Sequence, residues 1–278
     1  MIKPQLSFTN NRASFAVVGH PNKGKSSIVS TLARNDDINI SQQSGTTTKA
    51  NHYRIDTGQG GFELIDTPGF QRPQKVLKWL KNKATSADQY ANAIKSFVED
   101  ESCKLNFPDE VELLTPLVNG AAILYVVDGS RPYGTEYETE MEILRWTGRP
   151  SMALINPIES DEYIVPWKNA LHQFFKLVKV FNPMNADLDK QILLLNSFAL
   201  LEPKWKNNLD LVAEDLLNQE KQFVHQSITI LADLLVDCCS YQFQQKVLTK
   251  FDILISPEVR MVTKQGEQAF ADLAIDFE

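Results

Sequence analysis

The sequence has few cysteines and no long hydrophobic run. Its three cysteines, Cys103, Cys238 and Cys239, fit no metal-ligand spacing, and two of them are adjacent, which is poor geometry for a disulfide between them. No window holds the roughly 18 uncharged apolar residues that a membrane helix needs. The first residues contain no apolar core of a signal peptide. These absences predict a protein of the reducing cytoplasm with no membrane span.

Basic side chains are also outnumbered. The chain has 28 lysines and arginines against 35 aspartates and glutamates, a net charge of −7 and a pI near 5.2. A global field that attracts nucleic acid is therefore excluded, and the acidic balance argues against direct nucleic-acid binding. Lysines do recur between Lys75 and Lys83, but at a spacing that is more often a solvated helix face.

What is present is an alternation of short apolar runs with helical patterns. Strands are predicted at Ala13–Gly19, His52–Ile55, Phe62–Asp66, Ala121–Asp128, Ser151–Asn156 and Leu177–Phe181. Helices are predicted at Ser26–Arg34, Val76–Lys83, Tyr90–Val98, Glu136–Trp146 and Trp167–Phe175. This order is typical of an α/β domain whose central sheet is mostly parallel and is flanked by helices.

The pattern changes near Ala186, which predicts one domain over residues 1–185 and a mainly helical region over 186–278. Within the latter, Leu209–Val247 carries apolar residues at the spacing of a long amphipathic helix or a helix pair. Two interpretations stay open: a helical hairpin that packs on the first domain, or a surface for a partner or an oligomer. The mixed composition of Ile255–Glu278 leaves open that this region is incomplete.

The most specific motif is Gly19-His-Pro-Asn-Lys-Gly-Lys25-Ser26, which fits the phosphate-binding pattern G-x-x-x-x-G-K-[ST] between a predicted strand and a predicted helix. Glycines let the backbone curl so that successive N–H groups point at an anion, and the helix N-terminus adds partial positive charge. In this pattern Lys25 reaches the β- and γ-phosphates, and the hydroxyl of Ser26 ligates Mg²⁺. The motif predicts a nucleoside triphosphate site.

Two further segments favour a nucleotide switch. Asp66-Thr-Pro-Gly69 ends a predicted strand, so Asp66 can hold a magnesium-bound water and Gly69 can bring its N–H to a γ-phosphate. Between the motifs lies Ser44-Gly-Thr-Thr-Thr48, a hydroxyl-rich loop able to offer a threonine to Mg²⁺ only while the γ-phosphate is present. Each segment alone is a weak signal, since Pro-Gly turns and threonine runs are common in loops.

Together the three motifs resemble the Era and TrmE-like branch of translation-associated P-loop GTPases. The resemblance implies that Thr47 is the switch ligand of Mg²⁺, with Thr46 as second choice, and that Asn22 helps to hold a potassium ion against the phosphates. Phe70 stands where other GTPases carry a water-positioning glutamine. Hydrolysis would then rely on another group, a bound cation or a partner.

A closer resemblance covers most of residues 14–250. The segments that carry it are Ala122–Asp128, Arg131-Pro132, Glu142–Leu144, Gly148–Pro150 and Ile230–Asp237. They resemble a bacterial family of Era-like GTPases that has a poorly characterised helical C-terminal domain and whose members tend to be longer. By analogy with the branch, this implies work associated with the ribosome or RNA.

The guanine-reading motif of such enzymes, Asn-Lys-x-Asp, is altered here. The strand Ser151–Ile155 runs into Asn156-Pro157-Ile158-Glu159. Asn156 fits, but Pro157 offers only an apolar face, and Glu159 is one methylene longer than the aspartate it replaces. Glu159 is equally well interpreted as a solvated loop acid. Guanine specificity, relaxed base choice and recognition by other groups therefore stay open.

The predicted function is a guanine-nucleotide switch that hydrolyses GTP to GDP with Mg²⁺ and potassium assistance. The transition state would be stabilised by Lys25, Thr47 and the N–H of Gly69. The residues expected to bind the nucleotide are Asn22, Lys23, Gly24, Lys25, Ser26, Ser27, Asn156 and Glu159. The alternatives are a scaffold with vestigial hydrolysis and a P-loop ATPase of relaxed base specificity.

The segment Gln71–Thr115 is long for a simple return from the second switch. Because it directly follows Gly69, a γ-phosphate signal would move it, and we expect it to face an effector. A protein or ribosomal partner is thus expected at Gln71–Thr115 or at the C-terminal helices.

Overall fold

The predicted alternation of strands and helices is present in the computed structural model, which describes residues 12–33 and 49–250, and of residues 239–250 the backbone alone. The strands are β1 Ala13–Val18, β2 Asn51–Asp56, β3 Gly61–Asp66, β4 Ala122–Asp128, β5 Ser151–Asn156 and β6 Leu177–Val180. The α-helices are α1 Lys25–Ala33, α2 Pro73–Lys83, α3 Tyr90–Glu99, α4 Glu101–Asn106, α5 Pro108–Val118, α6 Glu136–Trp146, α7 Ile164–Leu171, α8 Leu188–Ala199 and α9 Lys206–Lys250. Short 3₁₀ turns lie at η1 Ala87–Gln89, η2 Pro183–Asn185 and η3 Pro203–Trp205.

The strands form one six-stranded sheet in the order β2-β3-β1-β4-β5-β6. Only β2 runs antiparallel to its neighbour β3, and the other pairs are parallel. The predicted fold class, a mostly parallel sheet flanked by helices with a C-terminal helical extension, is therefore confirmed. Since all five parallel strands end at one edge of the sheet, the loops after β1, β3, β4 and β5 gather there.

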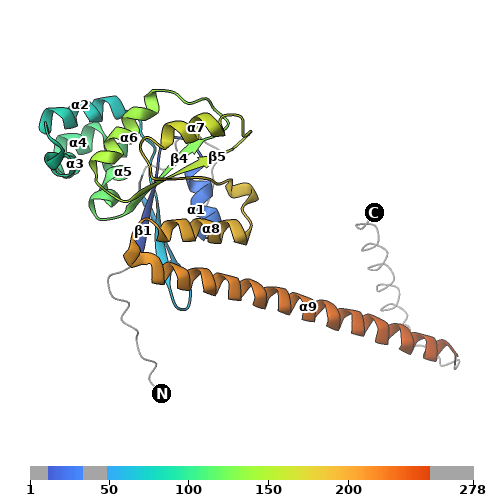
Figure 1. The fold of residues 1–278 in the computed structure, drawn as a ribbon. Coiled ribbons are helices and arrows are strands. Elements are labelled where there is room, and N and C mark those ends of the chain that lie inside the picture. The colour runs from blue at the N-terminus through green and yellow to red at the C-terminus, as the bar shows by residue number, and fades with distance from the viewer. Residues whose placement is uncertain (1–11, 34–48, 251–278) are drawn as a thin grey trace, which may run out of the picture. The chain divides into compact units, whose positions relative to one another are not determined.

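Helices cover both faces of this sheet, as Figure 1 shows. Alternate residues of each central strand point to opposite faces, so β1 places Phe15 and Val17 in one apolar cluster and Ala16 and Val18 in the other. One cluster is closed by α2, α3, α5, α6 and α7, and the other by α1, α8 and the first turns of α9. Burial on both faces explains why β4 is apolar along most of its length.

The helices between Gln71 and Thr115 are more numerous than the sequence indicated. The two predicted helical patches correspond to α2 and α3, and α4 and α5 follow them. Leu113, Leu114 and Leu117 of α5 are fully buried in the first cluster. The segment is thus a helical layer packed on the sheet.

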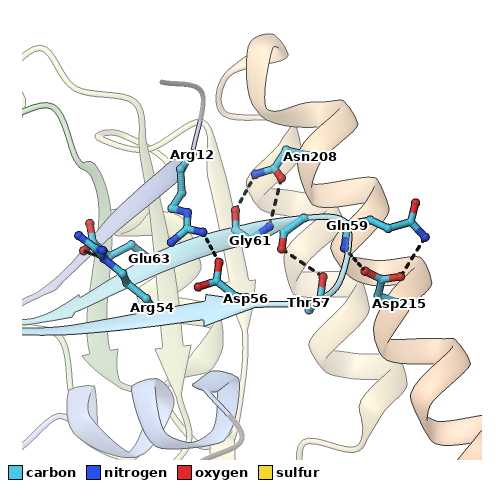
Figure 2. A network of polar contacts seen from close by, with 10 residues as sticks. Arg12, Arg54, Asp56, Thr57, Gln59, Gly61, Glu63, Asn208 and Asp215 are labelled. Carbon is cyan, nitrogen blue, oxygen red and sulfur yellow. Dashed lines mark hydrogen bonds and ion pairs between the residues drawn. The ribbon is translucent and has the colours of Figure 1, made fainter. Parts of the chain in front are cut away.

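The first turns of α9 hold the turn between β2 and β3, as Figure 2 shows. The amide of Asn208 donates to the carbonyl oxygen of Gly61 (2.6 Å) and accepts from its N–H (3.1 Å). The carboxylate of Asp215 accepts from the backbone N–H of Gln59 (2.9 Å). A Cβ on Gly60 would lie 2.7 Å from the carbonyl oxygen of Asn208, so this close approach requires glycine.

Two compact units divide the chain at Asn218 and Gln219. The first unit includes α8 and the start of α9, where Leu209, Val212 and Leu216 are buried. The division expected at residues 185 and 186 stays a prediction. Of the two interpretations of Leu209–Val247, the backbone of α9 is that of one continuous helix.

Beyond Asn218 the described apolar side chains of α9 are exposed. They are Phe223, Val224, Ile228, Ile230, Leu231, Leu234, Leu235 and Val236, each with about half or more of its surface accessible. No helix within residues 12–33 and 49–250 combines the length and the apolar character that crossing a bilayer requires.

Candidate phosphate-binding site

The candidate site begins where β1 ends and α1 starts. Between them the backbone turns through three residues of positive φ, Gly19 (+142°), Asn22 (+60°) and Gly24 (+81°). Asparagine is one of the few residues besides glycine that adopts this region readily. A Cβ on Gly19 would lie 2.5 Å from the carbonyl oxygen of Val126, and one on Gly24 would lie 2.3 Å from the amide nitrogen of Asn156. Glycine is therefore required at both positions, and the turn leaves backbone N–H groups available at the start of α1.

Lys25 lies under this loop with 8% of its surface exposed. Its ammonium group donates to the carbonyl oxygens of His20 (3.0 Å) and Gly19 (3.4 Å). Burial lowers the pKa of Lys25 to about 8, although the carboxylates of Asp66 and Glu140 act in the opposite direction. A phosphate in the loop would supply the anion that this buried ammonium lacks.

The residues predicted to hold Mg²⁺ come together from two elements. The hydroxyl of Ser26, at the start of α1, donates to the Oδ2 of Asp66, at the end of β3, over 2.6 Å. A hydroxyl and a carboxylate are oxygen donors of the kind that Mg²⁺ prefers. No group of three His, Cys, Asp or Glu side chains gathers into a metal cluster within the described residues. The pair thus fits a cation that phosphate oxygens and water would help to coordinate.

The second predicted switch lies against the phosphate loop. A Cβ on Gly69 would lie 2.5 Å from the backbone nitrogen of Pro21, and the N–H of Phe70 donates to the carbonyl oxygen of Gly19 (3.2 Å). The hydroxyl of Thr67 donates to the carbonyl oxygen of Val17 (2.8 Å). Gly69 is therefore placed beside the turn that would hold the phosphates. Thr46 and Thr47 of the first predicted switch lie outside the described residues.

At the base end of the site, Asn156 is positioned and Glu159 is not turned inward. Asn156 is 3% exposed and donates from its amide to the carbonyl oxygen of Lys23 (3.2 Å), which ties β5 to the phosphate loop. The carboxylate of Glu159, whose side chain is 69% exposed, lies 3.6 Å from the guanidinium of Arg131. The two residues of the altered motif are therefore in different environments.

Two acidic residues that sequence reasoning missed also contact the phosphate loop. Asp128, at the end of β4, lies 3.5 Å from the ammonium of Lys23. Glu140 of α6 is 1% exposed and contacts the Nδ1 of His20 (2.8 Å) while accepting from the hydroxyl of Tyr125 (2.9 Å). Asp128 ends the most apolar strand, which is a visible signal, whereas the position of Glu140 depends on how α6 packs.

Comparisons with known proteins agree with this site. A family model described as 50S ribosome-binding GTPase matches residues 14–156, just over half of the chain. A second model, described as a domain of unknown function (DUF3482), matches residues 168–265.

Among curated proteins, the chain is similar to GTPase Der of Mycoplasma pneumoniae, with 32% identity over 108 residues, which are 38% of this chain and 24% of that protein. It is also similar to GTPase Der of Nitratiruptor, with 24% identity over 147 residues, 53% of this chain and 26% of that protein. The matched part thus spans about a quarter of the length of these relatives.

Two solved structures of Era share the sheet architecture at 19% identity. One is an Era variant of Aquifex aeolicus bound to GDP and AlF₄⁻, with a TM-score of 0.43 over 66% of this chain and 56% of that one. The other is Era with MgGDPNP and a segment of 16S ribosomal RNA, with a TM-score of 0.45 over 67% and 56%.

Proposed function

The chain belongs to the 50S ribosome-binding GTPase family, as an Era-like P-loop GTPase, and from this premise we propose that it is a switch that hydrolyses GTP to GDP and phosphate with Mg²⁺. The observation that carries the proposal is the meeting of Lys25, Ser26, Asp66 and Gly69 at one loop, with Ser26 bonded to Asp66 over 2.6 Å. These groups come from the two motifs that contact phosphate and sense its γ position.

The chain's own residues would act as follows. The N–H groups of the loop and the ammonium of Lys25 bind the phosphate oxygens, and the N–H of Gly69 approaches the γ-phosphate from the second switch. Ser26, Asp66 and Thr47 hold Mg²⁺, which when bound neutralises charge on the phosphates. Water attacks in line. Because Phe70 is buried and apolar, it cannot orient that water, and we assign the missing help to a potassium ion at Asn22 or to a partner.

The test is single-turnover hydrolysis of GTP with excess protein and Mg²⁺, in potassium and in sodium. We expect turnover that is faster in potassium, and Asn22→Ala should remove the difference between the two salts while leaving the sodium rate unchanged. Binding without any turnover would favour the alternative of a scaffold with vestigial hydrolysis. Equal rates in the two salts would refute the potassium assignment alone.

Relaxed base choice is the second candidate, and one observation favours it. Pro157 lacks the lysine stem, and the carboxylate of Glu159 is exposed beside Arg131. Competition of GTP, ATP and XTP against fluorescent GDP decides between the candidates. Displacement by GTP alone supports guanine reading through Asn156 and Glu159 or substitutes, whereas equal displacement by ATP would make the chain a P-loop NTPase without base preference.

A partner of the switch is proposed at the helical layer Gln71–Thr115 or at the C-terminal helices. The family name points to the ribosome, and the net charge of −7 favours a protein surface over bare RNA. Limited proteolysis with and without a non-hydrolysable GTP analogue tests the first surface, because identical cleavage within Gln71–Thr115 in both states would refute it. A cytoplasmic location stays a prediction.

A further inference from the structure

Helix α5 carries two glutamates that accept hydrogen bonds from backbone N–H groups next to both switches. The Oε1 of Glu110 accepts from the N–H groups of Gln71 (3.0 Å) and Arg72 (2.5 Å), directly after Phe70. The Oε2 of Glu112, one turn-half further on, accepts from the N–H of Ala50 (3.2 Å) at the end of the first switch. One helix thus contacts the points at which both phosphate-sensing segments rejoin the sheet.

Glu110 is an unusual residue for such a contact because it is 1% exposed. The hydrogen-bond donors that the described residues give it are both backbone N–H groups. A buried carboxylate without donors is strongly disfavoured, so any movement that pulled Gln71 and Arg72 away would leave Glu110 in an unfavourable state. The carboxylate therefore holds these two residues in place.

Helix α5 itself is firmly fixed. Leu113, Leu114 and Leu117 are fully buried against the sheet. The guanidinium of Arg149 donates to the carbonyl oxygens of Leu117 (2.7 Å) and Val118 (2.9 Å) at the end of the helix. Glu110 is consequently presented from a rigid element, as a positioning group should be.

The short segment between Gly69 and Arg72 is held at both ends. On one side Gly69 lies against Pro21, and the N–H of Phe70 bonds to the loop. On the other side Glu110 holds Gln71 and Arg72. The N–H of Gly69, which must meet the γ-phosphate, is therefore placed by the phosphate loop and by α5 together.

We propose that Glu110 is a positioning residue for hydrolysis, which fixes the backbone after Phe70 so that Gly69 stays aligned with the phosphate loop. Glu112 performs the same service at Ala50. This inference rests on the proposed GTPase function. It assigns the rate of the chemical step, rather than nucleotide affinity, to a carboxylate that lies in the helical layer and touches no nucleotide.

The test compares Glu110→Leu, which removes the acceptor, with Glu110→Gln, which keeps a carbonyl oxygen in its place. Asp109→Leu, in the same helical turn, is the matched control. We expect Glu110→Leu to lower the single-turnover rate by about tenfold or more while the affinities for GTP and GDP stay within about threefold of the unaltered chain. Glu110→Gln and Asp109→Leu should both keep the rate within about threefold.

Hydrogen exchange supplies a readout independent of turnover, because the amides of Gln71 and Arg72 should exchange faster in Glu110→Leu alone. Equal rates and equal exchange in Glu110→Leu and the unaltered chain would overturn the positioning role and leave the GTPase proposal intact. A matching fall in Asp109→Leu, or a parallel loss of nucleotide affinity in Glu110→Leu, would show a general structural role instead. An unaltered chain that binds GTP without hydrolysing it would overturn both proposals.

Discussion

At the residue scale, the buried ammonium of Lys25 makes nucleotide binding depend on pH. In the free protein its pKa is about 8, below the ordinary 10.5, because burial disfavours the charge. Bound phosphate favours the charged form and raises that pKa. Below about pH 8 the ammonium is charged before binding, so affinity is level. Above it, binding must take up a proton, and we expect affinity to fall by up to about tenfold per pH unit.

Titration of nucleotide affinity between pH 7 and 9.5 checks this slope. Lys25→Met provides the control, because any slope that remains in this weaker binder belongs to the nucleotide or to other groups. If the unaltered chain and the Lys25→Met variant had the same slope, the ammonium would not be the titrating group.

Gly24 combines a positive φ with a close approach, and the two effects can be separated. Gly24→Ala would force alanine to φ +81° and place its Cβ 2.3 Å from the amide of Asn156. Gly148, at φ +64°, has nothing within 4 Å of the corresponding position. Both substitutions should cost about 1–2 kcal/mol of stability for the backbone conformation. Only Gly24→Ala should also weaken nucleotide binding, by about tenfold or more, because Asn156 and the loop must move apart.

Thermal unfolding and nucleotide titration of the two variants give both quantities. Equal affinity of Gly24→Ala and Gly148→Ala for the nucleotide would mean that the contact between Asn156 and the loop does not shape the site.

At the element scale, the grip of α9 on the β2–β3 turn should contribute measurably to stability. Asn208→Ala removes two hydrogen bonds and leaves the N–H and carbonyl groups of the buried Gly61 without these partners. We expect a loss of about 1–3 kcal/mol in the free energy of unfolding. Asn207→Ala, at the exposed neighbouring position, should change it by less than about 0.5 kcal/mol. Urea unfolding followed by tryptophan fluorescence compares the two, and equal losses would contradict the assigned contact.

Elements with a continuous apolar pattern could be predicted from the sequence, and the others could not. The strands were predicted nearly to the residue because burial on both faces leaves unbroken apolar runs such as that of β4. Helix α5 was missed because Pro116 interrupts its pattern. Helix α7 begins at Ile164, earlier than predicted, because Pro166 is tolerated in a first turn whose N–H groups lack helical partners.

The candidate site divides in the same way. The residues of the phosphate loop and of Asp66-Thr-Pro-Gly69 are local in the sequence, and spacing alone identifies them. Glu140 and Glu110 contact these motifs only because α6 and α5 pack on the sheet. No spacing rule links Glu110 to Gln71, since the intervening helices set the distance between them.

At the scale of the whole molecule, the face of the sheet opposite α5 and α6 is closed by residues from the C-terminal part of the chain. The ring of Phe15 in β1 lies 4.3 Å from that of Phe198 in α8 and 5.3 Å from that of Trp205. Val212 and Leu216 of α9 extend the same cluster. The first compact unit accordingly ends at Asn218, after the last of these contacts.

This arrangement predicts how the chain tolerates truncation. A chain that ends at Asn218 should fold and bind nucleotide with the affinity of the full chain, and it should be less prone to aggregate because it lacks the exposed apolar side chains from Phe223 to Val236. A chain that ends at residue 185 should be insoluble or unfolded, because Phe15 and Phe62 would lose their cover. Circular dichroism, thermal unfolding and nucleotide titration of both chains check the prediction. A folded, nucleotide-binding chain of residues 1–185 would show instead that α8 and α9 only dock on a nucleotide domain that is already complete.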